Sequence, residues 1–474
     1  MNEIYNNYSR IVILGAGPAG LSVLSEADKV GVDCVLIDCN SYGIASVDVK
    51  RFTQQSLNVK KTTGRFGGTA RFWGNQIAYL SIQDESNWKV IGGVEEDFFY
   101  LLNSELKTFL AQNLNSRVSS LKIFKRNEIR SSLYQTRTFY PKNDAVINQI
   151  KVKKVLSRTK LIEKEISELE IVGQYISCIR FSDKSQFKIG PNDAVIVALG
   201  CVESTKLLAR SLIKSDKKQD LFFGGLVDHP AGNVLKFQMP RLAKKVPRKH
   251  KERNHKKLFE SIEQNEQVFR SARCEIKLED EEMPFRLALR ELLLDFKFSR
   301  ATILIRYLLR RILPYFVFSR IIKCNYLVWI QIEQLPNPNI GISFAGPEPV
   351  SNWKLTEDDK VFILRTSTVM QEYIEEEFQP SYVSQLVSKD TIDSKFMHAF
   401  HPSSLLSSNV ELHANKLKVD IFGRIRELEN CRVASTAIFP TSGWFNPTLT
   451  LVLISRIITR SLLLKGYFQE SVKC

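Results

Sequence analysis

The sequence lacks several features that would assign it to common protein classes. It has no C-x-x-C pair, and its eight cysteines follow no spacing that suggests disulfide pairing. Its nearest approach to a long apolar run, residues 303–322, carries four arginines. The opening residues, MNEIYNNYSR, contain no basic segment followed by an apolar one. We therefore expect no secretory signal, no transmembrane helix and no metal site, and we expect free thiols in a reducing cytoplasm.

Repeats and low-complexity stretches are also absent, and the 44% hydrophobic content is that of a globular protein. At 474 residues the chain is long enough for two domains or one large interleaved pair. The net charge is +16, and about +10 of it falls within residues 241–330. No recognition motif accompanies this charge, so nucleic-acid binding is not favoured. Two interpretations stay open: solvated basic helices of a substrate domain, or a basic amphipathic surface over residues 285–323 that contacts an anionic membrane.

The strongest local pattern is a glycine-rich turn between an apolar run and a helix-like segment. The sequence GAGPAG follows the first apolar run, and a second apolar run ends in an acid. Gly15 permits a tight turn, Gly17 lets a pyrophosphate approach the backbone, and Gly20 lets helix and strand pack closely. The acid can accept hydrogen bonds from the adenosine ribose. The residues assigned to this dinucleotide site are Gly15, Gly17, Pro18, Ala19, Gly20 and Asp38.

Further segments occur in an order that resembles one oxidoreductase family. They are GRFGGTARFWGN at 64–75, AVIVALGCVESTKLLARS at 194–211, GLVDHP at 225–230, EQLPNP at 333–338 and VASTAIFPTSGWFNPTLT at 433–450. Together they resemble the glucose–methanol–choline (GMC) family, and they are closest to its sugar-oxidising branch. The resemblance covers nearly the whole chain and is weakest from about 236 to 325.

The resemblance implies FAD as the cofactor. The glycine-rich loop contains no histidine that would carry a covalent link, so we expect non-covalent binding. The helix that starts near residue 446 would direct its backbone N–H groups and positive dipole towards the flavin. The further residues that the resemblance assigns to the cofactor are Gly67, Gly68, Thr69, Trp73, Leu161, Ala198, Gly200, Ser435, Ala437, Asn446, Pro447 and Thr448.

The resemblance also implies a catalytic pair. His401 would be the general base that takes the hydroxyl proton, and Asn446 would hold the oxygen while hydride leaves for the flavin. His398 is the alternative base, and a structural role for both histidines also stays open. The family follows this His with x-x-Gly-Thr, whereas Ser404 stands at the glycine position here. The family usually has Asp where Ser435 stands, and Ser still donates or accepts a hydrogen bond.

These observations predict an α/β fold, in which a Rossmann-like FAD-binding domain is interleaved with an α+β substrate domain that contains an antiparallel sheet. We expect an FAD domain at 1–235 with 81–150 as a lid, a substrate domain at 236–410, and a return to the FAD domain at 411–474. The expected activity is oxidation of an alcohol on a sugar or a sugar-like molecule. The alternatives are a non-sugar alcohol, such as a sterol, and a flavoprotein without redox turnover. The electron acceptor stays open.

Overall fold

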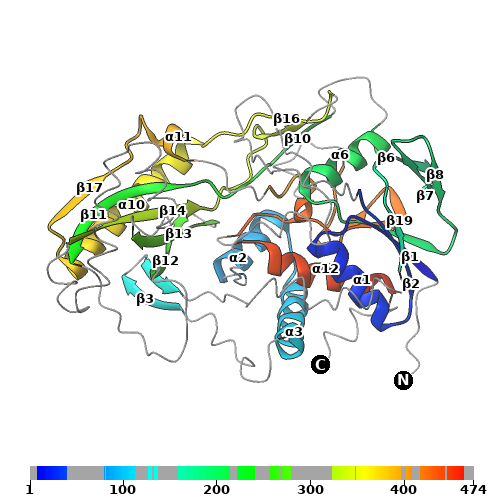
Figure 1. The fold of residues 1–474 in the computed structure, drawn as a ribbon, viewed down its shortest axis with the longest axis horizontal. Coiled ribbons are helices and arrows are strands. Elements are labelled where there is room, and N and C mark those ends of the chain that lie inside the picture. Colours follow the sequence, from blue (N-terminus) through cyan, green and yellow to red (C-terminus); the bar gives the residue numbers. More distant parts are fainter. Residues whose placement is uncertain are drawn as a thin grey trace, which may run out of the picture.

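The chain forms two large β-sheets at opposite ends of the molecule, with helices α2 (Ile82–Gly92) and α12 (Thr448–Leu463) between them (Figure 1). The computed structural model describes residues 8–39, 80, 82–113, 126–130, 133–136, 159–213, 221–240, 257–265, 268–278, 323–346, 349–396, 402–407, 417–443 and 446–463.

The first sheet is mainly parallel. Its strands, in spatial order, are β18 (Arg424–Ile425), β19 (Leu428–Val433), β9 (Asp193–Val197), β1 (Arg10–Leu14), β2 (Asp33–Ile37) and β5 (Lys160–Ile162). All neighbours from β19 to β5 pair in parallel, and only β18 is antiparallel to its neighbour. Strand β9 is buried along its whole length, which is expected of a parallel strand that is covered on both faces. The predicted α/β character is therefore confirmed.

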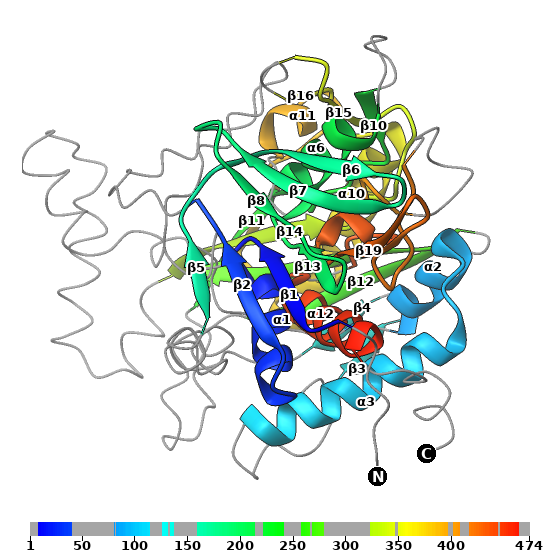
Figure 2. The same ribbon diagram turned by 90° about the vertical axis from the view of Figure 1, so that its right-hand side faces the viewer.

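Helices cover one face of this sheet, and a small antiparallel sheet lies beyond the other (Figure 2). The surrounding elements are α1 (Pro18–Lys29), α3 (Glu96–Asn113), α6 (Cys201–Leu212), β6 (Ile166–Val172), β7 (Tyr175–Phe181) and β8 (Gln186–Lys188). Helix α12 is apolar on nearly all sides, and it packs against both α1 and α3 within one hydrophobic core. A helix of that composition is expected only in a protein interior.

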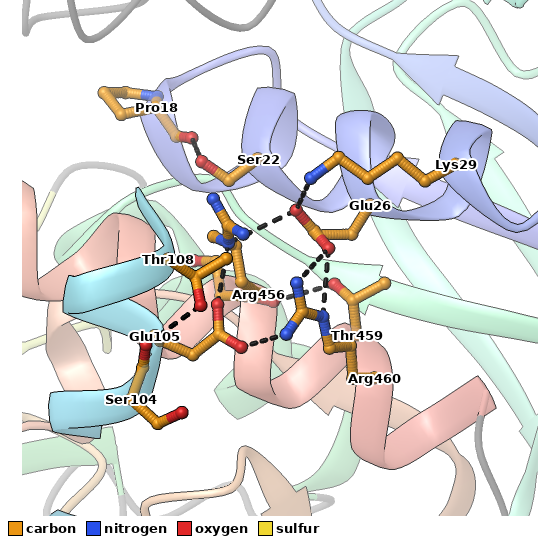
Figure 3. A network of polar contacts seen from close by, with 11 residues as sticks. Pro18, Ser22, Glu26, Lys29, Ser104, Glu105, Thr108, Arg456, Thr459 and Arg460 are labelled. Atoms are coloured by element: carbon orange, nitrogen blue, oxygen red, sulfur yellow. Dashed lines mark hydrogen bonds and ion pairs between the residues drawn. The ribbon is translucent and has the colours of Figure 1, made fainter. Parts of the chain in front are cut away.

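Two glutamates and two arginines join three of these helices inside the core (Figure 3). Arg456 Nε of α12 lies 3.2 Å from Glu26 Oε1 of α1 and 3.0 Å from Glu105 Oε2 of α3. Arg460 pairs with the same two glutamates. These four side chains form the framework cluster. Figure 3 shows α1, from Pro18 to Lys29, and α12, from Arg456 to Arg460, running in the same direction. Glu26 lies about as far along α1 as Arg456 lies along α12, so the two helices begin at the same end.

The second large sheet is antiparallel, as predicted. Its strands, in spatial order, are β17 (Tyr382–Gln385), β11 (Ala231–Pro240), β14 (Lys323–Ile332), β13 (Val268–Leu278), β12 (Lys257–Asn265), β4 (Leu133–Thr136) and β3 (Arg126–Arg130). Helix α10 (Glu357–Phe378) packs on one face of this sheet and closes a separate hydrophobic core. Its first turn is fixed by a capping box between Thr356 and Asp359. Strands β3 and β4, from the segment predicted as a lid, belong to this sheet.

The other described elements are short. They are β10 (Phe222–Gly224), β15 (Gly341–Ser343), β16 (Val350–Ser351), α11 (Ile392–Lys395) and the 3₁₀ helix η7 (Thr436–Ile438). Of the helices that the structure describes, none has the length and apolar composition needed to cross a membrane. Residues 281–322, which include most of the predicted basic surface, lie outside the described residues.

Candidate active site

The glycine-rich turn after β1 has the geometry that the sequence predicts. Gly15 has a φ of +106°, and a Cβ there would lie 2.5 Å from the carbonyl oxygen of Ala198. A Cβ on Gly20 would lie 1.9 Å from the carbonyl oxygen of Gly15. Any larger residue at either position would therefore push the turn away from α1 or from the neighbouring strand.

Helix α1 begins directly after this turn, and its first backbone N–H groups face outward. Pro18 occupies the first turn, Gly17 is the N-cap, and the helix has no side-chain cap. A Cβ on Gly17 would meet no atom within 4 Å among the described residues. Ala19, the next residue after Pro18, is buried against the core. The start of α1 thus combines open space with the positive end of the helix dipole, which is the environment that phosphate groups prefer.

Asp38, the predicted ribose ligand, follows β2 at the same edge of the sheet. Its Oδ1 accepts a hydrogen bond of 3.2 Å from the backbone N–H of Ala16. Burial raises the pKa of Asp38, and Glu163 adds to the rise, although the bond from Ala16 opposes both. Leu161, the residue predicted to face the adenine, lies in β5 opposite Leu36 of β2. The structure therefore brings Asp38 and Leu161 to adjacent strands.

A second turn, after β9, lies beside the first. The backbone N–H of Ala198 donates to the carbonyl oxygen of Leu14 at 2.8 Å. Gly200 is the N-cap of α6, and its φ is +83°. The strand order reverses between β1 and β9, because the chain continues to β2 on one side and reaches β9 on the other. Ligands of open α/β sheets bind at such a switch point, outside the carboxyl ends of the strands.

The chain reaches the same edge a third time after β19. The backbone N–H of Ala434 donates to Val197 of β9 at 2.9 Å. Ser435 is fully buried, and its hydroxyl accepts a 3.2 Å hydrogen bond from the backbone N–H of Ala437. This bond starts η7. Ser435 therefore caps a short helix beside the candidate site, and its contact with a cofactor stays a prediction.

Helix α12 begins at this edge as well. Its assigned start is Thr448, one residue after the predicted first helical position at Pro447, whose carbonyl oxygen accepts from the backbone N–H of Leu451. The hydroxyl of Thr448 donates to Asn446 Oδ1 at 3.3 Å. This bond occupies the amide oxygen, so the amide nitrogen of Asn446 remains as the group that can donate to a substrate oxygen.

The predicted bases His401 and His398 lie outside the described residues, and so do Gly67, Gly68, Thr69 and Trp73. The residues that follow His401 are described. Thr436 Oγ1 donates to the carbonyl oxygen of Pro402 at 2.9 Å, which joins this segment to η7. Ser404 has a φ of +71°, a conformation that glycine adopts without strain. Residue 404 therefore has a backbone conformation that suits glycine, although serine stands there.

A buried polar cluster, formed where β14 ends and the segment before α12 begins, was not predicted. Glu333 is 1% exposed, and its Oε1 accepts from the backbone N–H of Gly443 at 3.0 Å. His229 Nε2 donates to the carbonyl oxygen of Gly443 at 2.6 Å. Thr441 also bonds the carboxyl group of Glu333, and Asp84 of α2 lies close enough to influence its ionisation. These five residues form the site cluster.

Burial raises the pKa of Glu333 to about 8, and the nearby Asp84 adds to the rise. Hydrogen bonds from Thr441, Ser271 and Gly443 oppose this rise because they stabilise the ionised form. The sequence contained one signal of this acid, its place in EQLPNP directly after an apolar strand. A glutamate that stays neutral at pH 7 is uncommon, and such groups gather at functional sites.

The sequence matches no protein-family model and no curated protein. The fold is similar to that of pyridoxine 4-oxidase from Mesorbium loti, with a TM-score of 0.57 and 12% identity over 95% of this chain and 98% of the other. It is also similar to formate oxidase from Aspergillus oryzae, in a variant made to study FAD modification. There the TM-score is 0.56 and the identity 11%, over 98% of this chain and 100% of the other. The chain therefore has the fold of these two oxidases.

Proposed function

We propose that the chain is a GMC-type flavoprotein that binds FAD without a covalent link and oxidises an alcohol. One observation carries this proposal: α1 and α12 begin at the same edge of a parallel sheet, at its switch point. Two positive helix ends there suit a cofactor that is anionic at its pyrophosphate and gains negative charge on reduction. The shared fold with two oxidases supports the proposal.

The residues at this edge fit the cofactor. The space in front of Gly17 leaves the first N–H groups of α1 free to bind the pyrophosphate. Asp38 ends the strand beside this turn, where its carboxylate can accept from the ribose hydroxyls. Bound FAD would supply the chemistry that the chain lacks, by accepting a hydride from the substrate carbon.

In the proposed reaction, His401 takes the proton of the substrate hydroxyl, and the amide nitrogen of Asn446 donates to the oxygen. The bond from Thr448 supports this role for Asn446, because it restrains the side chain through its amide oxygen and does not use its amide nitrogen. The segment after His401 is tied to η7 through Pro402, so it lies near the edge where α12 begins. Two groups that act on one hydroxyl from fixed positions would orient it for hydride transfer.

The proposed substrate is a sugar or a sugar-like alcohol, since the carboxyl-terminal block 433–450 is closest to the sugar-oxidising branch. A non-sugar alcohol is the second candidate, because the dipeptide at 401–402 also occurs in the sterol-oxidising branch. We propose no identity for the electron acceptor.

The direct test is the visible spectrum of the purified protein under anaerobic conditions. Sugars, nucleotide sugars, sterols, pyridoxine and formate are added in turn, and bleaching of the flavin bands identifies the substrate class. Acid precipitation should release the flavin into the supernatant if the cofactor is not covalently bound. A protein that binds no flavin after FAD is added would contradict the proposal.

Replacing His401 with Ala should leave FAD bound and slow flavin reduction by about 100- to 10,000-fold, since general-base catalysis is lost. The matched control is His398→Ala, for which we expect a change of less than roughly threefold. The two variants are compared by stopped-flow absorbance with the substrate that the panel identifies. A large loss in the His398 variant alone would assign the base to His398 instead. Unchanged rates in both would favour a flavoprotein without this chemistry.

A further inference from the structure

The peptide group of Gly443 is held from both sides. Its N–H donates to Glu333 Oε1 at 3.0 Å, and its carbonyl oxygen accepts from His229 Nε2 at 2.6 Å. Glu333 and His229 are each at most 1% exposed. Gly443 itself has a φ of +72°, which other residues adopt only with strain. This peptide is therefore specified by two buried side chains and by its own conformation.

The peptide group of Gly443 lies in the chain segment that leads directly to Asn446 and α12. Gly443 precedes Asn446 by three residues, and α12 begins two residues later. A displacement of Gly443 therefore acts on the residue proposed to orient the substrate and on the helix end that faces the proposed flavin. Such second contacts decide how accurately a catalytic group is placed.

The elements around Glu333 are themselves fixed. Ser271 of β13 donates to Glu333 Oε2 at 3.0 Å, and Trp88 of α2 donates to Thr441 at 3.2 Å. Asn87 of α2 exchanges two hydrogen bonds with the backbone of Phe269 in β13. Helix α2, which carries Asp84, is thus attached both to the antiparallel sheet and to the segment that leads to α12.

The ionisable groups near Glu333 favour its neutral form. Asp84 faces it from α2 and would repel a second negative charge. His229 lies in the segment before β11, and its Nε2 donates to Gly443 and not to Glu333. The side chain of Asp228 accepts from the backbone N–H of His229. Ser271 and Thr441 contribute hydroxyl groups that carry no charge. Ionisation of Glu333 would therefore place a buried negative charge next to Asp84 and beside the start of α12.

We propose that Glu333 is a positioning residue for the oxidation site: its carboxyl group, together with His229, holds the peptide group of Gly443 and through it the start of α12 in their working arrangement. This inference rests on the proposed function for what the arrangement does. Ionisation of Glu333 would add a buried negative charge beside Asp84 and the segment that leads to α12, and this charge would oppose the negative charge that a bound flavin gains on reduction. Both FAD affinity and flavin reduction should therefore decline as Glu333 ionises.

The protonation of Glu333 can be measured without turnover. The infrared spectrum of the FAD-loaded protein at pH 7 should contain the carbonyl band of a buried protonated carboxyl group, and Glu333→Gln should remove it. The control Glu357→Gln, at an exposed acid whose pKa is lowered by Lys360, should leave the band unchanged. Asp84→Asn removes a negative charge that raises the pKa of Glu333, so the band should titrate with a midpoint at lower pH than in the wild type. Identical carbonyl bands in the wild type and Glu333→Gln would overturn the inference.

The functional consequence is a decline in the rate of flavin reduction between pH 7 and pH 9. With a pKa of about 8 for Glu333, the protonated fraction falls about tenfold over this range, and the rate of flavin reduction should follow it. Glu333→Gln keeps a neutral acceptor for Gly443, so its rate should stay within roughly twofold over the same range. FAD affinity, measured by fluorescence titration of the apoprotein, should weaken with pH in the wild type alone.

The two proposals fail in different ways. If no alcohol bleaches the flavin of any variant, the proposed function fails, and the infrared band and the FAD titration still test Glu333. If the wild type and Glu333→Gln lose FAD affinity and flavin reduction in parallel above pH 8, Glu333 is not the group responsible, and the inference is wrong while alcohol oxidation stands.

Discussion

The framework cluster and the site cluster both bury carboxyl groups, but neighbouring charges drive their ionisation in opposite directions. Burial raises the pKa of Glu26, yet Arg460 and Arg456 outweigh it, so this pKa lies below its ordinary value. For Glu333, burial and Asp84 act together and raise the pKa to about 8. Both glutamates are at most 5% exposed, so burial does not distinguish them. The protein neutralises its carboxyl groups with arginine where helices are joined, and with a proton beside the candidate site.

The largest expected effect comes from removing an arginine of the framework cluster. Replacing Arg456 with Met leaves Glu26 and Glu105 buried with only Arg460 as a shared partner. Breaking a buried ion pair in this way typically costs about 3–5 kcal/mol, so the free energy of unfolding should fall by that amount. Denaturant unfolding at pH 7 measures the change.

The matched control is Arg424→Met, which removes the ion pair between Arg424 and Asp420 on the surface. Arg424 is 58% exposed in its side chain, and exposed pairs contribute less than about 1 kcal/mol. Equal losses of stability in the two variants would show that the buried ion pairs of the framework cluster contribute no more to stability than an exposed pair.

The second prediction concerns how stability changes with pH. The ordinary pKa of Glu is 4.5, and Glu333 has a pKa of about 8 in the folded chain. Between these values the folded state holds a proton that the unfolded state has released. The contribution of Glu333 to the free energy of unfolding should therefore fall steadily as the pH rises from 4.5 to 8.

Glu26 should act in the opposite direction. Because its folded pKa is lowered, its contribution is present above pH 4.5 and is lost as the pH falls further. Unfolding curves at pH 5, 6, 7 and 8 isolate the effect of Glu333, because the loss attributed to Glu26 begins only below this range. Glu333→Gln should lose the decline attributed to Glu333, whereas Glu357→Gln should keep it. A decline of the same steepness in both variants would contradict the contrast between the two clusters.

The sequence predicted the features that depend on local pattern. The turn after β1, the strand β9 and the start of α12 are each encoded within a few consecutive residues, and the structure has all three. The site cluster could not be predicted in this way. Its bonds join Gly443 to Glu333, 110 residues apart, and to His229, 214 residues apart. Such contacts depend on how the two sheets and α2 meet, which no local pattern specifies.

The same limit explains Ser435. The sequence placed it at the cofactor, and the structure uses its hydroxyl to start η7. A short polar side chain can satisfy either role, and the choice depends on which backbone N–H lies within reach. The position was predicted from the sequence, but the partner of the hydroxyl was not.

The smallest expected effect tests whether unfavourable features also occur in the backbone beside the site cluster. Ser404 has a φ of +71°, and its buried hydroxyl makes no hydrogen bond within the described part of the chain. Ser404→Gly should remove both penalties and raise the free energy of unfolding by about 1 kcal/mol. Thermal or denaturant unfolding measures this gain.

The adjacent Ser403 is the matched control. Its buried hydroxyl also lacks a hydrogen bond within the described part of the chain, but it pairs with Val227 in a short β-bridge and does not have a positive φ, so the two serines differ in backbone conformation. Glycine in such an extended position costs about 0.5–1 kcal/mol, so Ser403→Gly should lower stability. The same substitution at two neighbouring serines should thus have opposite signs. If both variants are destabilised, residue 404 is not strained, and the cost beside the site cluster is confined to the proton on Glu333.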